Sequence, residues 1–413
     1  MLPKDLLDKV PTLNELLEHP RVREAARSWN DSTLVARARG ALMELGSEIS
    51  RRSESWSEAS PRDLFDRVLH LLDRPDAPPS SELINGTGKM SSAAGWKQVP
   101  LAEEVVAYAV QQAGFFTCGD VPSTSADNCL KRLTKAESGL VASSYVTAHE
   151  AFLRSLSTQA GQGGAIIVGR PDVGSVEPGH RFLTLCEANL VSAVEVGAAQ
   201  QATSNDYLEA IEQLKKQDAN SQPWVYLGTA LLEQLTTHDD KAALIEFISA
   251  MHKQKARLVV GLDDASPCDL PGPLDCSFLT ASKALELGAD LVLLRGNGMV
   301  GGPAVGLLVG RRNEVDAIAH VLTEHHWHAS EWDKVLVEAT LTLFEQPERL
   351  PFRHPIASLL DTPIENLRTR AERLALLINS SEAIASAEPI ELTDRKVASG
   401  LRSSNSWGIK LTP

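Results

Sequence analysis

Seven short apolar runs between residues 139 and 309 constrain the fold of this chain more than any other feature. Most of them are separated by amphipathic stretches of helical length, such as 207–217 and 242–252. The runs are 139–142, 165–169, 193–197, 224–228, 257–262, 290–294 and 305–309. Continuous apolar strands that alternate with helices indicate a mostly parallel sheet covered by helices on both faces. We therefore predict a large α/β domain over residues 83–320.

Residues 1–80 predict a separate module of three short amphipathic helices. Thr12-Leu-Asn-Glu15 is a capping box, so a first helix should start near residue 13 and run to about residue 28. A second helix should follow Asp31 or Ser32. Ser60-Pro61-Arg62-Asp63 marks a third start, with proline in the first turn. The proline-rich stretch 75–79 then indicates a linker.

The chain beyond residue 320 predicts a smaller domain. Residues 332–344 and 364–378 have helical patterns, and residues 388–412 contain short strand-like runs. A mixture of helices and strands without the alternation of the preceding region is typical of an α+β arrangement. We therefore predict a small C-terminal α+β domain over residues 321–413.

Composition narrows the class of protein. The 413 residues are 43% hydrophobic, yet no apolar run approaches the ~18 residues of a membrane-spanning helix, so we expect a soluble chain without a membrane span. The N-terminus lacks the features of a secretory signal, which favours the cytoplasm. Five cysteines without C-x-x-C spacing indicate neither a disulfide framework nor a zinc site. A net charge of −14 disfavours nucleic-acid binding by the chain as a whole.

A glycine-rich loop lies between the last two apolar runs. Glycines at 296, 298, 301 and 302 precede Pro303, which indicates a strand, a tight loop and a second strand. Residues 288–310 resemble the segment GADLVxFSGDKxLGGPQAGxxxG, which carries the cofactor lysine in the bacterial selenocysteine synthase (L-seryl-tRNA(Sec) selenium transferase) family. When GADLV and GGP are aligned, the lysine position of the family falls on Gly298.

Further motifs that resemble this family follow in order along the chain. They are INGTGKM at 84–90, LTKAESGLV at 133–141, VEVG at 194–197, WDK at 332–334 and RAE at 370–372. The resemblance implies the fold-type-I pyridoxal-phosphate transferase fold. It also implies a dimer or larger homo-oligomer, and tRNA contact through the N-terminal module. The alternative for that module is a solvated helical cap or an oligomer contact.

The resemblance assigns positions for pyridoxal-phosphate chemistry, and two of them hold glycine. The aldimine requires a lysine amine, but the lysine position is Gly298. The acid that keeps the pyridinium nitrogen protonated falls on Gly261, and a slipped register would place Asp263 or Asp264 there. We therefore predict no catalytic residue and no covalent cofactor, with Asp263 as a pocket residue.

The phosphate-binding part of the site is retained in the sequence. Ser143 and Ser144 follow an apolar strand and precede a helix, where hydroxyl and backbone N–H groups hold phosphate. We expect this vestigial cup to bind phosphate weakly, with His149 near the position of the cofactor ring. The alternatives are a structural Ser-Ser cap, a core or capping histidine, and a cup filled by a side chain such as Arg295 or Tyr145.

Other motifs of the family near the chemistry are missing. Segments 93–98, 117–123 and 198–202 replace HTNLGR, GxRGSR and TTNRT of the family. Losses near the chemistry within a retained scaffold favour a catalytically degenerate, selenocysteine-synthase-like protein that acts through binding or assembly. The alternative is an active pyridoxal-phosphate-dependent L-seryl-tRNA(Sec) selenium transferase or a related lyase, with Lys89 or Lys283 as a displaced aldimine lysine.

A histidine cluster at 324–328 is a candidate metal site, because imidazole suits zinc, nickel and copper. Helical spacing does not bring His325, His326 and His328 to one face, since neighbours on a face lie three or four residues apart. We therefore predict a solvent-exposed helix end and no metal.

Overall fold

The computed structural model describes twelve stretches of the chain, which fall into two compact units, Met1–Gly86 and Thr87–Pro413. The predicted domain limits 1–80, 83–320 and 321–413 stay predictions. The predicted linker 75–79, the segments 93–98 and 117–123, Lys89, and the motif 84–90 apart from Asn85 lie outside the described residues. The described residues are 9–25, 31–51, 60–72, 85, 99–115, 125–159, 164–218, 222–236, 241–380, 384–395, 401–402 and 404–412.

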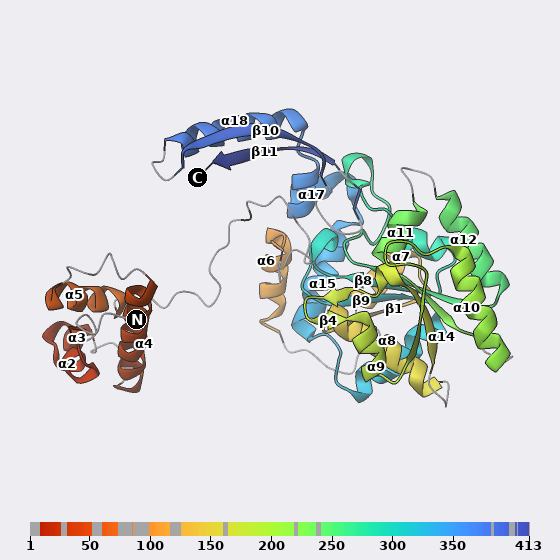
Figure 1. Ribbon diagram of the computed structural model, residues 1–413, viewed down its shortest axis with the longest axis horizontal. Coiled ribbons are helices and arrows are strands. Elements are labelled where there is room, and N and C mark those ends of the chain that lie inside the picture. Colours follow the sequence, from red (N-terminus) through yellow and green to blue (C-terminus); the bar gives the residue numbers. More distant parts are fainter. Residues whose placement is uncertain are drawn as a thin grey trace. The chain divides into compact units, whose positions relative to one another are not determined.

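The first unit contains a small group of helices, coloured red to orange in Figure 1. They are α2 (Leu13–Glu18), α3 (Pro20–Ala25), α4 (Asp31–Arg51) and α5 (Pro61–Leu72). The apolar stripes of these helices face one another, as amphipathic helices do in a folded domain. The buried side chains that they share include Leu16, Ala38, Leu45, Ile49, Leu64 and Val68.

Side-chain caps and a proline set the limits of the first helices. Oγ1 of Thr12 accepts the N–H of Glu15 at 3.3 Å, and Oε2 of Glu15 accepts the N–H of Thr12 at 2.8 Å, which confirms the predicted capping box. The predicted continuation to residue 28 is wrong, because the helix ends at Glu18. Pro20 disfavours a helical conformation at His19, which has φ −66° and ψ 134°, and a new helix starts at the proline.

A seven-stranded sheet forms the centre of the second unit, with the order β1-β9-β8-β7-β6-β2-β5. The pairs β5–β2, β2–β6, β6–β7 and β7–β8 are parallel, whereas β9 is antiparallel to both β8 and β1. Each predicted run forms one of these strands, so the mostly parallel sheet is confirmed. The bounds are β1 (Ser138–Ala142), β2 (Ala165–Gly169), β5 (Ser192–Val196), β6 (Trp224–Leu227), β7 (Arg257–Leu262), β8 (Leu291–Arg295) and β9 (Gly306–Gly310).

Helices cover both faces of this sheet (Figure 1). Successive residues of a strand point to opposite faces, and in β7 Leu258 and Val260 belong to one buried cluster whereas Val259 belongs to a second. The first cluster includes α7 (Ser125–Thr134), α10 (Ser204–Gln217), α11 (Thr229–Leu235), α12 (Ala242–Lys253) and α13 (Ala281–Leu287). The second includes α8 (Tyr145–Gln159), α9 (Phe182–Ala188) and α14 (Arg312–Glu324).

Smaller elements complete the second unit. α15 (Glu331–Leu343) packs against α7 and α6 (Glu103–Gln112), and α18 (Ile364–Asn379) packs on an antiparallel hairpin, which confirms the helices and strands predicted for this region. No helix in the described part of the chain is long and apolar enough to cross a membrane. The remaining bounds are β3 (Ser175–Glu177), β4 (His180–Arg181), α16 (Leu350–Arg353), α17 (Pro355–Leu360), β10 (Ser386–Arg395) and β11 (Ser404–Thr412).

The glycine-rich loop joins β8 to β9 and contains a short 3-10 helix, η6 (Gly298–Val300). The buried His354 ties it down: Nε2 donates to the carbonyl O of Val300 at 2.9 Å, and Nδ1 accepts the N–H of Ala357 at 3.1 Å. Gly301 has a φ of 66°, and a Cβ at this position would overlap the imidazole of His354. The loop therefore needs glycine at 301 both for its backbone and for its space.

Replacing this glycine should destabilise the second unit. Gly301→Ala places a side chain in the left-handed region and against a buried ring, so we expect a loss of about 2 kcal/mol or more in the free energy of unfolding. Urea unfolding of the variant and of Gly174→Ala measures the effect, because Gly174 lies in the same unit, has ordinary φ, and has no atom near an added Cβ. Equal midpoints for the two variants would contradict the prediction.

Candidate functional site

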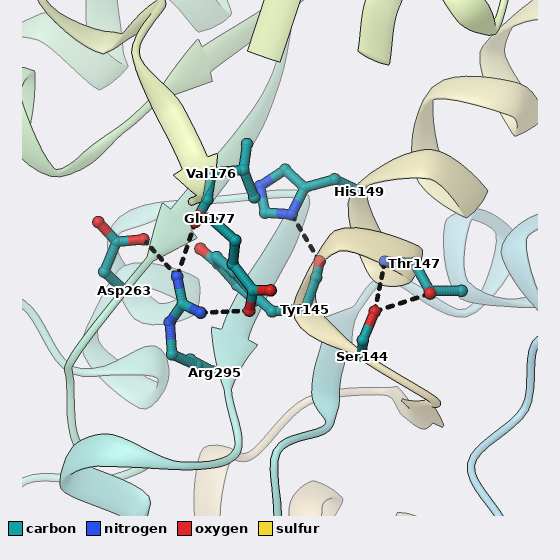
Figure 2. A network of polar contacts seen from close by, with 8 residues as sticks. All are labelled: Ser144, Tyr145, Thr147, His149, Val176, Glu177, Asp263 and Arg295. Atoms are coloured by element: carbon teal, nitrogen blue, oxygen red, sulfur yellow. Dashed lines mark hydrogen bonds and ion pairs between the residues drawn. The ribbon is translucent and has the colours of Figure 1, made fainter. Parts of the chain in front are cut away.

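Polar side chains from distant parts of the second unit meet at the carboxyl edge of the parallel strands (Figure 2). Asp263 follows β7, Arg295 ends β8, and Ser144 follows β1, which runs in the same direction as β8. Glu177 reaches Arg295 from β3. Because ligands of open α/β sheets bind outside the carboxyl ends of the strands, this edge is the candidate functional site.

The guanidinium of Arg295 occupies the middle of the site. The side chain is 3% exposed, Nη1 donates to Oε1 of Glu177 at 2.5 Å, and Nη2 donates to the carbonyl O of Val176 at 2.8 Å. Oδ1 of Asp263 lies 3.5 Å from Nη2. The guanidinium carbon lies over the ring of Tyr145, 4.3 Å from its centroid. Two carboxylates, a carbonyl and an aromatic face thus stabilise the buried charge.

The two serines lie at the start of α8. Oγ of Ser144 accepts the N–H of Thr147 at 3.0 Å and lies 2.8 Å from Oγ1 of the same residue, which is a helix cap. Ser143 is exposed, and its N–H donates to the carbonyl O of Trp327 at 3.0 Å. One amide of the predicted cup is therefore already bonded to the protein. Phosphate binding at this turn stays a prediction.

His149 is fully buried and lies next to Tyr145, with ring centroids 4.5 Å apart (Figure 2). Its Nδ1 is 2.9 Å from the carbonyl O of Tyr145, and its Nε2 is 3.1 Å from the hydroxyl of Tyr226. Since the carbonyl can only accept, Nδ1 carries the hydrogen and Nε2 accepts from Tyr226. Burial lowers the pKa of His149 to about 4. The imidazole is thus a neutral member of the network, with both nitrogens bonded inside the protein.

The glycines at the lysine and acid positions of the family face side chains that leave no room for a replacement. A Cβ at Gly298, where φ is 86°, would overlap Oδ1 of the buried Asp264. A Cβ at Gly261 would overlap the hydroxyl of Tyr226. A lysine at 298 or an acid at 261 therefore requires a buried neighbour to move.

Two carboxylates, Asp263 and Asp172, accept hydrogen bonds from the start of α11. Asp263 accepts from Oγ1 of Thr229 at 3.1 Å. Asp172 accepts the N–H of Gly228 at 3.0 Å and of Ala230 at 2.9 Å, at the start of α11. Burial raises the pKa of Asp172 to about 6 against the effect of these bonds, and the charge of Asp263 adds to the rise. In this structure Asp263 is an ion-pair partner of Arg295; its role in a cofactor pocket stays a prediction.

Space next to Asp263 is small. The cavity that it lines together with Thr229, Leu262 and Phe278 has a volume of about 10 Å³. That is close to the space of a single water molecule. The cavity is far smaller than a pocket for a small organic ligand.

The side chains of the other sequence candidates contact residues close to them in the sequence. Nζ of Lys283 bonds to Oε1 of Glu286 on α13 at 3.0 Å. At the end of α14, His325 stacks on Trp327 with centroids 4.6 Å apart, and Nε2 of His328 lies 3.0 Å from Oγ1 of Thr323. Among the described residues, no three His, Cys, Asp or Glu side chains are grouped so that they could hold a metal ion.

Sequence reasoning missed three residues of the site, namely Glu177, Tyr226 and Asp172. Arg295 had a usable signal, because a single cation ends an apolar strand directly before the glycine loop. Glu177 had none, since it lies 118 residues from its partner and sits in a short, irregular segment. Tyr226 reads as one more apolar residue of a strand, although its hydroxyl and its ring both contact His149 in the site.

His149 predicts a pH dependence of stability. Because its pKa in the folded protein is about 4 against an ordinary value of 6.5, the unfolded chain binds more protons between these values, and stability falls as the pH drops from 6.5 to 4. His149→Gln keeps a donor and an acceptor but does not titrate. Between pH 6.5 and 4 the variant should therefore lose about 3 kcal/mol less stability than the wild type, at about 1.4 kcal/mol per pH unit.

Urea unfolding of both proteins between pH 4 and 7 measures this difference. Asp172 contributes with the opposite sign, because its raised pKa makes the folded chain bind more protons between about pH 4 and 6. That contribution is common to wild type and variant and cancels in the comparison. Identical pH slopes would show that the imidazole at 149 is not held neutral by burial.

The sequence is similar to those of one family of known proteins. The sequence profile of the L-seryl-tRNA selenium transferase family matches residues 277–406, which include η6 and the loop around it. The L-seryl-tRNA(Sec) selenium transferase of Moorella thermoacetica is 26% identical over 405 residues, which cover 92% of this chain and 80% of that protein. The enzyme of the same name from Geobacter sulfurreducens is 26% identical over 411 residues, covering 93% and 84%.

The fold is also similar to that of solved structures. A D-glucosaminate-6-phosphate ammonia-lyase superposes with a TM-score of 0.54 at 14% sequence identity, and the alignment covers 78% of each chain. At this identity the likeness concerns the fold alone. By sequence the chain is similar to the L-seryl-tRNA(Sec) selenium transferase family over most of its length, and its sheet and helices have the fold-type-I pyridoxal-phosphate transferase fold.

Proposed function

We propose that this chain is a selenocysteine-synthase-like protein that does not use covalent pyridoxal-phosphate catalysis and acts through binding or assembly. The observation that carries the proposal is Gly298 at the lysine position of the family. The lysine amine is irreplaceable, because its nitrogen forms the link to the cofactor. Asp264 and the left-handed backbone at Gly298 support the proposal, since they occupy the space and the conformation that a lysine there would need.

The position of the family acid supports the same proposal. Tyr226 fills the space in front of Gly261, and its hydroxyl donates to His149, so no carboxylate lies at that position. The cation of the site, Arg295, is already bonded to Glu177 and lies 3.5 Å from Asp263. The residues at the site therefore do not fit pyridoxal phosphate.

The alternative function is an active pyridoxal-phosphate-dependent L-seryl-tRNA(Sec) selenium transferase or a related lyase, with a displaced lysine. Lys283 is one candidate, and it bonds to Glu286 on a helix rather than lying on the loop between β8 and β9. Lys89 is the other candidate and lies outside the described residues. Chemical trapping distinguishes this alternative from the proposed function.

Treatment with pyridoxal phosphate and borohydride should leave the protein without a specific adduct. We expect no internal aldimine absorbance band before reduction, and afterwards only scattered, substoichiometric modification of surface lysines. Peptide mass mapping measures the yield at each lysine. One lysine modified at stoichiometric yield would refute the proposal and identify the displaced residue.

Gly298→Lys is the matched variant for this experiment. If the proposal is right, restoring the amine alone should not restore the band, because Asp264 still occupies the space beside residue 298 and Tyr226 that beside Gly261. The variant should also unfold at lower urea than wild type, since its side chain enters a buried carboxylate's space in a left-handed conformation. An aldimine band in the variant would mean that the rest of the cofactor site is intact.

Assembly with a second copy is the form of binding that the surface favours. α18 exposes Leu374, Leu376 and Leu377 at 50%, 74% and 67%, while Ala371 and Ala375 on the same helix are buried. Exposed apolar side chains that gather on one element mark interaction sites. Two-fold homodimers are the commonest oligomers, so a second copy is the simplest occupant.

Light scattering at micromolar concentration should give a mass of at least twice the 44.6 kDa of one chain. Leu376→Lys combined with Leu377→Lys should shift the mass toward the monomer, because two charges then enter the apolar contact. Ile245→Lys is the control, since Ile245 is an exposed apolar residue at 50% on a different helix, α12. A monomeric wild-type protein would contradict this part of the proposal.

A further inference from the structure

Both terminal nitrogens and the face of the Arg295 guanidinium have partners, whereas its buried Nε has no hydrogen-bond partner among the described residues. One terminal nitrogen bonds to Glu177, the other bonds to Val176 and pairs with Asp263, and the plane lies over Tyr145 (Figure 2). These contacts match the planar fork of a guanidinium, which suits carboxylates in its plane and an aromatic ring on its face. We call Glu177, Asp263, the carbonyl of Val176 and the ring of Tyr145 the shell of this guanidinium. These are the kinds of group that a binding site for a small guanidinium compound would contain.

The charge of this shell also selects a cation. Glu177 and Asp263 contact the guanidinium directly. Burial lowers the pKa of Arg295, whereas Tyr145 and the carboxylates of Asp263, Glu177 and Asp264 raise it, and the rise is larger. Without the arginine, Glu177 and Asp263 would lose the guanidinium that contacts both. An anion such as phosphate would be repelled there.

The carboxylates of the shell are reachable from solvent although the guanidinium is not. The side chains of Glu177 and Asp263 are 32% and 25% exposed, whereas that of Arg295 is 3% exposed. Glu177 and Val176 both belong to β3, which pairs with β4 in a two-stranded ribbon. The arginine thus holds this ribbon in place at the rim of the site.

We propose that the shell of Glu177, Asp263, the carbonyl of Val176 and the ring of Tyr145 is a binding site for a guanidinium group, and that Arg295 is its resident intramolecular ligand. A small guanidino compound takes the place of the side chain when it is truncated. The inference rests on the proposed function in one respect, namely that no pyridoxal phosphate occupies this edge of the sheet.

Rescue of Arg295→Ala by methylguanidinium tests the site. Calorimetric titration should show saturable binding of methylguanidinium chloride to the variant and none to wild type, in which the side chain fills the site. Binding should be weaker by about tenfold or more when Glu177→Gln is added, because the carboxylate that accepts a hydrogen bond from the guanidinium is then replaced by a neutral amide. The unfolding midpoint of Arg295→Ala should rise with methylguanidinium and not with equal concentrations of sodium chloride, methylammonium or inorganic phosphate.

Arg257→Ala is the matched control. Arg257 also pairs with a carboxylate, Glu314 at 3.1 Å, and lies over an aromatic ring, Trp224, at 4.7 Å, but its side chain is 29% exposed. Truncating it opens a site that water fills, so methylguanidinium should not bind there measurably. Equal rescue of both variants would show a general effect of the additive and overturn the proposal.

The remaining outcomes also decide the question. A folded Arg295→Ala variant that binds no methylguanidinium, or binds methylammonium or phosphate equally well, overturns the proposal. If the variant does not fold alone, its refolding yield with and without methylguanidinium gives the same test, and an unchanged yield overturns it. A stoichiometric pyridoxal-phosphate adduct in wild type would refute the proposed function instead, and the two readouts are measured separately.

Discussion

Neutralisation of the buried Arg295 guanidinium is the interaction on which the arrangement of the candidate site depends. A cation taken out of water needs partners with good geometry, and removing one partner from a buried pair costs about 3–5 kcal/mol. Here the partners come from β3, from the end of β7 and from the first turn of α8. The position of each of these elements is therefore tied to the others through one side chain, and through it to β8.

Much of the scaffold could be predicted because it follows from local patterns. The seven apolar runs became the seven strands of the sheet, and the capping box at Thr12 formed as its two side chains require. The error in the first helix also had a local cause, since Pro20 was visible in the sequence and outweighed an otherwise helical pattern. Pairing was not local: the antiparallel position of β9 between β1 and β8 depends on which strands meet in space.

The candidate site was less predictable because its contacts join residues far apart in the chain. Resemblance to a family drew attention to Gly298 and Gly261, but the reason that glycine fits there is the space taken by Asp264 and Tyr226. Likewise, the sequence places His149 one turn into a helix without showing the Tyr226 hydroxyl that it accepts from. Such pairs arise where strands end side by side, and no periodicity in the sequence records them.

His354 connects the glycine loop to α17, and only one tautomer of its ring can make both bonds. Since the carbonyl of Val300 can only accept, Nε2 must carry the hydrogen of the neutral ring, which leaves Nδ1 as the acceptor for the amide of Ala357. A single tautomer therefore satisfies both contacts, and burial, which lowers the pKa of His354, keeps the ring in that neutral form. Adding a proton would occupy Nδ1 and remove the cap of α17, whereas the bond from Nε2 to the loop would persist. Acid would therefore release the start of the helix and leave the loop bonded to His354.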